Sequence, residues 1–377
     1  IRFDSIQPTT YTHPHIPKTD IYRTAMKLSV LLVLALASVA LVSVTVLGRP
    51  HRSHVHADLT RHRMVETVNS MKTTWTAGIN KRFAGQPIDA IKKQLGVRDV
   101  NPPMWKRPPL KIHTGFDIAA IPAEFDSRTA WPNCESLREV RDQSDCGSCW
   151  AFGAIEAATD RICIATKGAN KAHLSTEDMV GCCSSCGFGC NGGDPGAAWQ
   201  YLASTGAVTG GNYGDNSWCS AYSMPWCEHH NNHTTYPPCG GSEYPTPACP
   251  TQCDSGSTYQ TPFAKDKHIF KSAYSIGSDP SQIQQEIMTN GPVEVSFTVY
   301  ADFEAYTGGV YQHVSGDELG GHAVKMIGWG VDNSTGVPYW TIANSWNSDW
   351  GEGGFFRIIR GVDECGIEDY AVAGQWI

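Results

Sequence analysis

The sequence contains a cysteine, a histidine and an asparagine whose neighbouring residues suit amide hydrolysis, and the cysteine is Cys149. Cys149 follows Gly147 and Ser148, and apolar residues recur at helical spacing from Ala151 to Ile162. Glycine and serine suit a turn and an N-cap, so Cys149 is predicted to begin a helix. Free backbone N–H groups and the positive end of the helix dipole favour a thiolate there, which is the form of cysteine that attacks carbonyl carbons.

Covalent hydrolysis also needs a base for the thiol and a group that orients the base. His322 lies between glycines and a predicted strand, and Asn344 is followed by Ser345 and Trp346. Cys146 and Cys149 have the spacing of a C-x-x-C redox pair or half of a metal site as well. A redox pair is typical of a reducing compartment, and a metal site would need a second matching pair, so the distant His and Asn favour a nucleophile.

The elements that must position these residues change in character along the chain. Residues 121 to about 205 are rich in cysteine and contain the strongest helical pattern, whereas the chain after Phe270 shows short β-rich runs between glycine-rich turns. This contrast predicts a helical domain followed by a β domain. The predicted strands are Val293 to Val299, Ala323 to Ile327, Tyr339 to Ala343 and Phe355 to Ile359.

The run Cys146-Gly147-Ser148-Cys149-Trp150 fits the C-G-[SA]-C-[WY] signature of papain and cathepsin nucleophiles at every place. With the stretches around His322, Asn344 and Trp75, the chain from about residue 65 to 377 resembles the cathepsin B-like cysteine proteases. The resemblance implies an α+β papain-like fold of two domains, a helical left domain and a β-barrel-like right domain, with the active-site cleft between them. It implies a cysteine-type peptidase made as a zymogen, without a cofactor or metal.

The same resemblance assigns roles to particular positions. Cys149, His322, Asn344 and Gln143 are the implied catalytic residues, with the Gln143 amide and the Cys149 N–H holding the oxyanion. Trp346 would shield the contact between His322 and Asn344 from water. The implied substrate-binding residues are His229, His230, Gly147, Gly192, Gly193, Pro195, Ala323, Trp346 and Tyr370.

A stapled insertion between Cys219 and Cys253 is dense in proline, glycine and cysteine. Residues 227–239 in it resemble the occluding loop of cathepsin B, whose two histidines, here His229 and His230, bind a substrate's terminal carboxylate. Both endopeptidase and peptidyl-dipeptidase (carboxydipeptidase) activities are therefore expected. Adjacent histidines could also ligate a metal or simply be solvated.

Two departures from the family pattern bear on specificity. Asp142 matches the family's anchor for the first loop histidine, but the arginine that would pair with Asp349 is absent, which predicts a loop that opens more easily. Tyr370 stands where the mammalian enzyme has a glutamate that accepts arginine at P2. A phenol supplies no carboxylate, so apolar or aromatic residues are expected at P2.

The chain has 14 cysteines, which favours an oxidising, secretory route. The family's connectivity, carried over position by position, leaves Cys149 and Cys365 free. A zinc or iron–sulfur site at Cys182, Cys183, Cys186 and Cys190 is the less favoured alternative. The implied disulfides are Cys134 with Cys163, Cys146 with Cys190, Cys182 with Cys249, Cys183 with Cys186, Cys219 with Cys253, and Cys227 with Cys239.

The chain before the enzyme is divided by its composition. Residues 1–25 form an extension of uncertain status, and residues 26–48 resemble a secretory signal peptide, with a membrane anchor as the alternative. Residues 49–120 are predicted to be a propeptide, because the stretch around Trp75 resembles the propeptide of the family. Residues 121–377 are then the protease domain, with processing between about Gly115 and Ile121.

Charge separates these two parts. Residues 49–111 carry 13 Lys and Arg against 4 Asp and Glu, and residues 112–377 carry 12 against 31. An acidic main body is a poor partner for nucleic acid, so the basic segment is expected to dock on its own acidic body. We expect acid near pH 4 to 5 to weaken this hold and high salt at neutral pH to speed processing.

The expected partners are therefore protein and peptide substrates and the propeptide as inhibitor, with cystatin-type inhibitors as candidates. No nucleic acid and no stable membrane association are expected. The predicted location is the secretory pathway, either lysosomal or extracellular, where the sequons at Asn232 and Asn333 would be glycosylation candidates. A catalytically inert secreted binding protein on the same fold is the alternative function.

Overall fold

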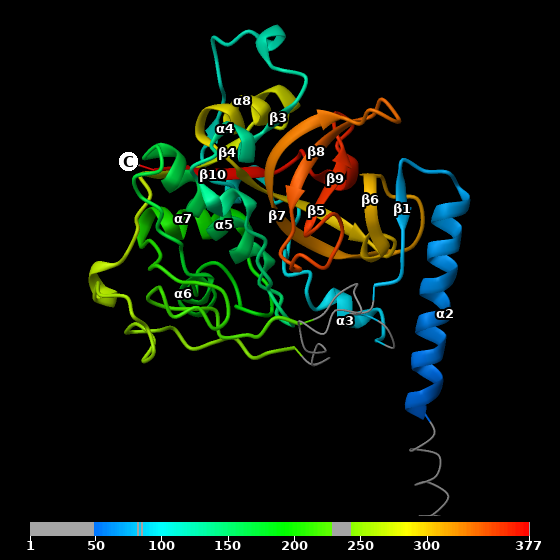
Figure 1. Ribbon diagram of the computed structural model, residues 1–377, viewed down its shortest axis with the longest axis horizontal. Helices are drawn as coiled ribbons and strands as arrows, with labels where there is room; N and C mark the ends of the chain where they lie inside the picture. Colours follow the sequence, from blue (N-terminus) through cyan, green and yellow to red (C-terminus); the bar gives the residue numbers. More distant parts are fainter. Residues whose placement is uncertain (1–48, 81–82, 84–85, 228–242, 377) are drawn as a thin grey trace, which may run out of the picture. The chain divides into compact units, whose positions relative to one another are not determined.

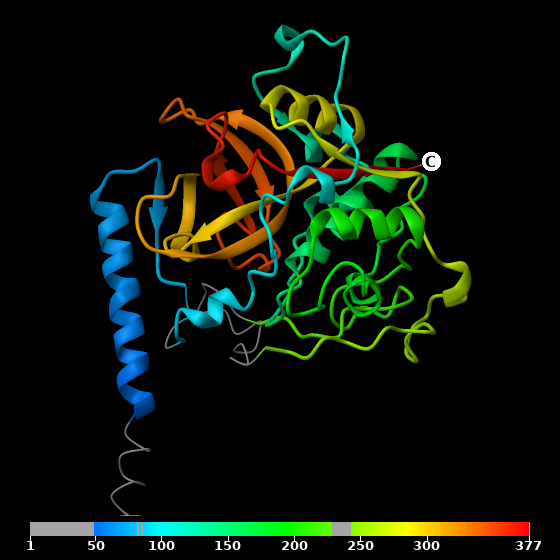
Figure 2. The same ribbon diagram turned by 180° about the vertical axis from the view of Figure 1, so that it is seen from behind.

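A long buried helix packed against a twisted mixed sheet dominates the computed structural model (Figures 1 and 2). The structure describes residues 49–80, 83, 86–227 and 243–376. Residues 54–377 form one compact unit. The predicted extension 1–25 and signal peptide 26–48 lie outside the described residues, as does most of the predicted loop 227–239. No helix in the described part of the chain is long and apolar enough to cross a membrane.

The predicted propeptide is built from short elements after one long helix. Its backbone joins the sheet of the main body twice: β1 pairs antiparallel with β6, and β2 pairs parallel with β4. Figure 2 shows the connecting segment, in cyan, crossing the face of the main body between these two strands. The elements are α2 (Arg49–Ser70), β1 (Trp75–Ala77), α3 (Asp89–Lys92), η2 (Met104–Lys106), β2 (Leu110–Lys111) and η3 (Ile118–Ala120).

The helical half of the main body is organised around α5 (Cys149–Ala165), in which every residue from Cys149 to Cys163 is buried. A helix that is buried on all sides lies in the middle of a domain, and α5 contacts elements of both halves. The next two helices start at capping residues. The Ser175 side chain caps α6, and the Asp194 side chain caps α7, whose first residue is a proline. The further elements of this half are β3 (Phe125–Asp126), α4 (Ser127–Ala130), η4 (Glu135–Arg138), α6 (Thr176–Cys182) and α7 (Pro195–Ser204).

The second half is the β part of the fold, as the short apolar runs predicted. The ten strands have the order β1-β6-β9-β8-β7-β5-β10-β4-β2, with β3 added beside β7, and the sheet they form in the described residues is open rather than a closed barrel. Its elements are η5 (Phe263–Lys265), β4 (Ser272–Ile276), α8 (Pro280–Asn290), β5 (Val293–Tyr300), η6 (Phe303–Ala305), β6 (Tyr306–Tyr311), β7 (Glu318–Val331), β8 (Pro338–Ala343), β9 (Phe355–Ile359), η7 (Glu364–Gly366) and β10 (Ala371–Gln375). Each predicted strand falls inside β5, β7, β8 or β9.

The two halves meet through buried charge as well as through apolar packing. Lys325 on β7 is 2% exposed, and its Nζ lies 2.8 Å from Asp160 Oδ2 and 3.7 Å from Glu156 Oε2 on α5. Breaking such a pair leaves an uncompensated buried charge, which typically costs about 3–5 kcal/mol. These contacts fix β7, which carries His322, against α5, which begins at Cys149.

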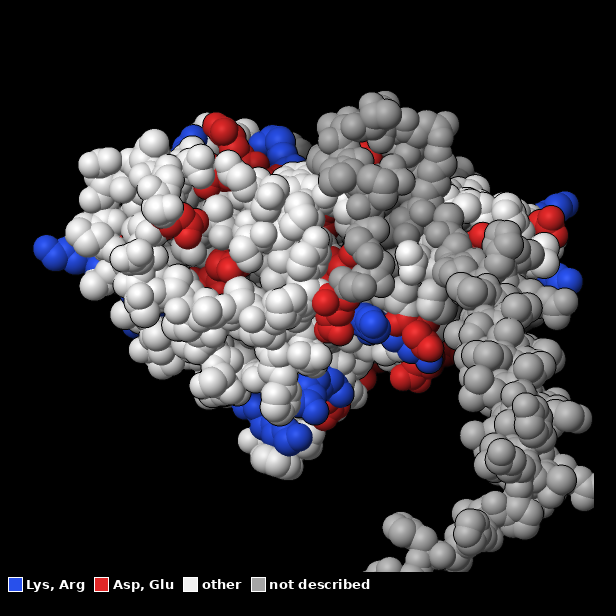
Figure 3. Space-filling view, turned by 90° about the horizontal axis from the view of Figure 1, so that it is seen from below, with Lys and Arg blue, Asp and Glu red and all other residues white. Residues whose placement is uncertain are grey.

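The charge asymmetry seen in the sequence does not give each face a single sign. On the face shown in Figure 3, acidic and basic side chains lie close together in small groups, and most of the surface between them is uncharged. The basic propeptide contacts the acidic main body through individual ion pairs, such as Arg61 with Glu304 and Lys111 with Glu286.

Five disulfides join the described residues, and they are the pairs that the family connectivity implies. Cys227 is also disulfide-bonded, while its predicted partner Cys239 lies outside the described residues. Cys149 and Cys365 are free. The bridges are Cys134–Cys163, Cys146–Cys190, Cys182–Cys249, Cys183–Cys186 and Cys219–Cys253.

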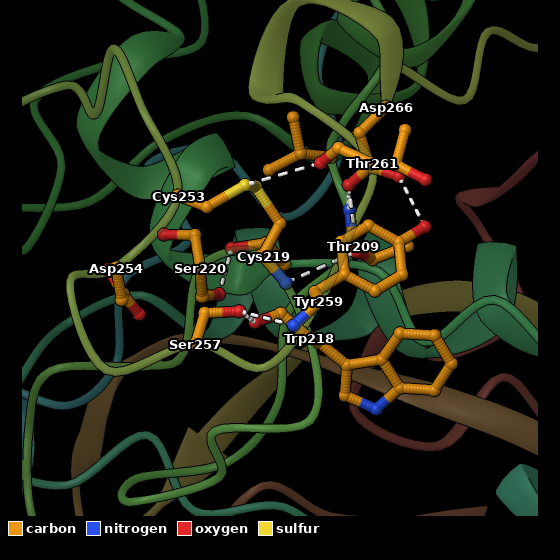
Figure 4. The surroundings of a disulfide bond; sticks show 12 residues. Thr209, Trp218, Cys219, Ser220, Cys253, Asp254, Ser257, Tyr259, Thr261 and Asp266 are labelled. Atoms are coloured by element: carbon orange, nitrogen blue, oxygen red, sulfur yellow. Dashed lines mark hydrogen bonds between the residues drawn. A yellow bond between two sulfur atoms is a disulfide. The ribbon is translucent and has the colours of Figure 1, made fainter.

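The last of these bridges closes the base of the insertion. Figure 4 shows Cys219 and Cys253 beside a hydrogen-bonded group in which Asp266 Oδ2 accepts from both the backbone N–H and the hydroxyl of Thr209 at 2.7 Å. Tyr259 Oη donates to Asp266 Oδ1 at 2.8 Å, and Cys219 N donates to Thr209 Oγ1 at 3.3 Å. A disulfide supported in this way holds the insertion to the helical half.

Candidate active site

Cys149 is the first residue of α5, as the sequence predicted, and its side chain is fully buried. Ser148 occupies the N-cap position, but its side chain does not cap the helix and instead lies 3.1 Å from Tyr222 Oη. The Cys149 side chain packs with Val97 and Ala323, and Ala323 directly follows His322 on β7. The structure thus brings together the cysteine and the histidine that are 173 residues apart in the chain.

The histidine and the asparagine are directly bonded. His322 Nε2 lies 2.8 Å from Asn344 Oδ1, and both residues are fully buried. The Trp346 ring lies 5.1 Å from the His322 ring, measured between centroids, and is itself fully buried. With Nε2 engaged by Asn344, His322 Nδ1 is buried without a hydrogen-bond partner in the described part of the chain. This nitrogen is therefore available to exchange a proton.

Gln143 is held in a fixed orientation beside the start of α5. Its Oε1 accepts from Ser345 Oγ at 2.7 Å, so its Nε2 is directed at two carbonyl oxygens, Cys146 O at 2.8 Å and Gln94 O at 2.9 Å. Gln94 belongs to the predicted propeptide. An amide donor that is preset by a neighbouring hydroxyl and already holds a peptide carbonyl can also stabilise an oxyanion.

The propeptide backbone lies directly on these groups. Gly96 N lies 3.1 Å from Cys149 Sγ, and Gly96 O accepts from Gly193 N at 2.8 Å. Val97 N donates to Gly321 O at 3.0 Å, so the same short segment bridges the helical half and the sheet. A Cβ on Gly96 would lie 1.8 Å from Gly147 O, which means that only glycine fits between the propeptide and the wall of the site.

Burial under this segment sets the protonation of the reacting pair. Burial raises the pKa of the Cys149 thiol to about 11, against the lowering effect of the Ala323, Gly96 and Trp150 backbone groups. Burial also lowers the pKa of the His322 imidazole to about 4, although the Asn344 hydrogen bond opposes this. The pair is therefore a neutral thiol and a neutral imidazole at pH 5 to 8. The thiolate expected from the helix position does not form in this state, because desolvation outweighs the helix end.

Two further predicted substrate-binding residues, Gly192 and Tyr370, lie against the propeptide. Gly192 has φ +96°, and a Cβ there would lie 2.7 Å from Gly96 O. Pro195 begins α7 and is buried. Tyr370 is 1% exposed, with the Arg107 guanidinium 4.7 Å above its ring, and its hydroxyl is buried without a hydrogen-bond partner in the described residues. His229 and His230 lie outside the described residues, as does Asn232.

Only the base of the predicted occluding loop is described. Asp142 Oδ2 accepts from Cys227 N at 3.2 Å and from Asn347 Nδ2 at 2.9 Å, and Asn347 Nδ2 also donates to Cys227 O at 2.7 Å. Asp349 Oδ2 is buried and lacks a hydrogen-bond partner within the described part of the chain. The loop base is thus anchored through Asp142 and Asn347.

Two features of the site were not predicted from the sequence. One is that Gln94 and Gly96 contact Gln143 and Cys149. These contacts use the propeptide backbone, which every residue type provides, so the sequence gives little signal of them. The only signal is the single glycine, Gly96, after an apolar residue. The other is Glu294, a fully buried carboxyl on β5, whose charge raises the pKa of Cys149 and whose own pKa burial raises well above its ordinary value.

This arrangement has counterparts among known proteins. The sequence model for papain family cysteine proteases matches residues 121–375, and the one for the peptidase family C1 propeptide matches residues 62–101. The chain therefore belongs to the papain family of cysteine proteases. It is a cysteine peptidase that carries the propeptide of a zymogen.

Within the family, cathepsin B-like proteinases are among the similar proteins. Cathepsin B-like cysteine proteinase 6 of Caenorhabditis elegans is 50% identical over 321 residues, which are 84% of this chain and 84% of the relative. A cathepsin B-like cysteine proteinase of Schistosoma japonicum is 48% identical over 301 residues, or 80% of this chain and 86% of the relative. The solved structure of procathepsin B S9 from Trypanosoma congolense has a TM-score of 0.70 and 33% identity, and the match covers 83% of this chain and 97% of that one. The chain is accordingly a cathepsin B-like cysteine peptidase with a self-inhibiting propeptide.

Proposed function

We propose that the chain is cut between about Gly115 and Ile121 and that residues 121–377 then hydrolyse peptide bonds at Cys149. The observation that carries this proposal is the Gln94 carbonyl held by the Gln143 amide beside the thiol, because a scissile carbonyl would occupy the same place. Asp117 and η3 are exposed in the proposed processing region, which suits cleavage.

Removal of residues 94–97 returns water and substrate to the pair, and the shifts caused by burial are relieved. A proton then passes from Cys149 to His322, whose ring is fixed by Asn344, and the thiolate attacks the peptide carbonyl. Gln143 Nε2 and Cys149 N stabilise the oxyanion, and His322 protonates the leaving amine. Water hydrolyses the thioester with His322 as base.

The carboxydipeptidase activity rests on the loop that begins at Cys227. Asp142 is the described anchor of its base. The sequence lacks the arginine that would pair with Asp349, which supports a loop with one anchor fewer than in mammalian cathepsin B. Such a loop leaves the primed side of the cleft open more often. Asp349→Asn, which removes a charge without changing shape, should shift the ratio of dipeptide release to internal cleavage by less than about twofold, whereas Asp142→Asn should favour internal cleavage.

Tyr370 is proposed as the floor of the P2 pocket. A fully enclosed phenol ring offers an apolar surface, so peptides with Phe at P2 should be cleaved faster than those with Arg. Equal turnover of Phe-Arg and Arg-Arg substrates would contradict the assignment.

Passage through the secretory pathway is proposed from the disulfides, with the enzyme lysosomal or extracellular. Asn333 is exposed in a turn and is a suitable glycan acceptor. Cystatin-type proteins are the proposed inhibitors after processing.

The test is active-site titration of acid-processed enzyme with an epoxysuccinyl thiol reagent, together with hydrolysis of a Phe-Arg fluorogenic peptide. Stoichiometric labelling and loss of hydrolysis are expected, and both should be absent in Cys149→Ala. Iodoacetamide should label Cys149 far more slowly in the unprocessed chain, because the thiol there is buried and neutral. A wild-type chain that is folded and processed but neither labels nor hydrolyses would leave the inert binding protein as the function.

A further inference from the structure

The end of the propeptide occupies a second site on the main body, beyond the reacting residues. After passing Tyr370, the chain pairs through β2 with the outer edge of β4. Ser275 N donates to Pro109 O at 3.0 Å, and Ser275 Oγ donates to Pro108 O at 2.9 Å. These bonds use the propeptide backbone alone, so they hold any extended segment that can approach the strand.

A buried carboxylate lies at the end of this edge. The Glu286 side chain on α8 is fully buried, and its Oε2 lies 2.9 Å from Lys111 Nζ and 2.7 Å from His113 Nε2. Its Oε1 is used within the main body, where it accepts from Arg161 at 2.9 Å and from Tyr274 Oη at 2.6 Å. One oxygen of Glu286 thus belongs to the enzyme, and the other serves the propeptide.

Two further contacts complete the recognition of this segment. Gln282 on α8 binds the His113 backbone in both directions, with His113 N donating to Oε1 at 2.7 Å and Nε2 donating to His113 O at 3.2 Å. The Lys111 ammonium also lies 4.2 Å from the centre of the Tyr274 ring. Leu110, by contrast, is 49% exposed and contributes its backbone only.

We propose that, once residues 49–120 are removed, the surface formed by the outer edge of β4, Glu286 and Gln282 is a peptide-binding site of the processed enzyme. Its ligand is an extended basic segment with a lysine and, two residues later, a histidine or another hydrogen-bond donor. Removal of the propeptide leaves Glu286 Oε2, the outer edge of β4 and Gln282 unpaired together, and an extended basic strand restores all three.

This site would hold a protein substrate by a strand outside the cleft, and a released propeptide fragment would compete for it. The inference rests on the proposed removal of the propeptide but not on catalysis. Because the papain family model spans residues 121–375 by itself, the processed enzyme is expected to be a complete folding unit.

The experiment uses a fluorescent peptide of residues 107–114 and processed enzyme made from the full chain, with Cys149 blocked by iodoacetamide so that the peptide is not cut. Fluorescence anisotropy should rise to saturation as enzyme is added. A Lys111→Ala peptide should bind about fivefold more weakly, since it loses a charge-assisted bond to a buried carboxylate. A Leu110→Ala peptide is the matched control and should bind within about twofold of the original.

The enzyme side is tested with Gln282→Ala, which removes only the backbone contacts, and with Glu286→Gln. Both should weaken binding while the far-UV circular dichroism is unchanged. If either variant fails to fold, the peptide series still decides the matter. Absence of saturable binding, equal binding of the Lys111→Ala peptide, or equal binding of a scrambled peptide of the same composition would overturn the proposal. Amino-terminal sequencing and thiol titration of the same sample show separately whether processing and catalysis occurred.

Discussion

The two ends of the propeptide hold the main body through two buried glutamates that respond to burial in opposite ways. At the amino-terminal end, Arg61 on α2 lies 2.8 Å from Glu304 Oε1. At the carboxyl-terminal end, Lys111 and His113 share Glu286 Oε2. Burial outweighs the Arg61 charge and raises the pKa of Glu304 to about 7, whereas the pKa of Glu286 is held well below its ordinary value despite its burial.

The difference lies in how many donors each carboxylate has. Glu304 Oε2 is buried without a hydrogen-bond partner in the described part of the chain, so one cation at one oxygen has to offset the whole cost of desolvation. Glu286 accepts from Arg161, Tyr274 and Asn290 at one oxygen and is paired with two propeptide cations or donors at the other. A buried carboxylate therefore keeps its charge only where several donors converge on it.

The largest effect should come from apolar contact at the amino-terminal end. Trp75 is 3% exposed, packs 5.1 Å from the Tyr311 ring and donates to Gln312 O at 2.9 Å. Trp75→Ala should weaken docking of this end by about 3–5 kcal/mol. The measurement is hydrogen exchange of β1 in the unprocessed chain, in a Cys149→Ala background that prevents self-processing.

The matched control for this prediction is Trp105→Ala. Trp105 is 80% exposed in the same propeptide, so its removal should leave exchange in β1 within about 0.5 kcal/mol of the parent. Equal effects of the two substitutions would show that the Trp75 contacts do not hold this end.

The second prediction concerns the pH dependence of the Glu304 pair. Once α2 and β1 leave, Glu304 meets water and its pKa should fall back to about 4.3. Docking of this end thus takes up a proton, so its contribution is fully present below about pH 4.3 and is lost as the pH rises through about 7. Glu304→Gln, neutral at every pH, should remove about 3 kcal/mol of pH dependence between pH 4 and 8.

Exchange of β1 at several pH values tests this sign, with Glu66→Gln, an exposed carboxyl on α2, as the control. For Glu304 the structure gives the opposite of the expectation that acid near pH 4 to 5 loosens the propeptide. Weaker protection of β1 at pH 4.5 than at pH 7.5 in the Cys149→Ala chain would restore that expectation.

Some of these features could be predicted from the sequence and others could not. The helix start at Cys149 and the four strands follow from local periodicity, and the disulfide pairs and the pairing of His322 with Asn344 follow from family motifs. The charge state of Cys149 could not be predicted from the sequence. A helix start favours the thiolate, and only burial under Gly96 makes the neutral thiol the stable form. Glu286 gave no signal either, since its partner Arg161 stands 125 residues earlier and the two meet only when α8 packs on α5.

The third prediction tests the other end of the propeptide. Because the docked pKa of Glu286 lies below the ordinary value, its stabilising contribution is present above about pH 4.3 and is lost only as the pH falls further. Lys111→Met should weaken docking of residues 108–113 by about 1 kcal/mol, equally at pH 5 and pH 7, since its side chain is one-third exposed. The readout is hydrogen exchange at Ser275, and a loss that varies with pH in this range would contradict the proposed charge state of Glu286.

The smallest expected effect is that of salt, which should screen the partly exposed ion pair at the carboxyl-terminal end of the propeptide more than the buried pair at the amino-terminal end. Arg61 is 6% exposed and lies against Glu304, whereas the Lys111 side chain is 34% exposed. Raising the salt to 1 M should therefore weaken the Lys111 contact by a few tenths of a kcal/mol and leave the Arg61 contact unchanged. Exchange at Ser275 should rise slightly with salt while exchange in β1 stays constant, and Lys111→Met should abolish the salt effect. A salt effect of equal size at both ends would show that docking depends on the overall charge of +9 against −19 and not on these two ion pairs.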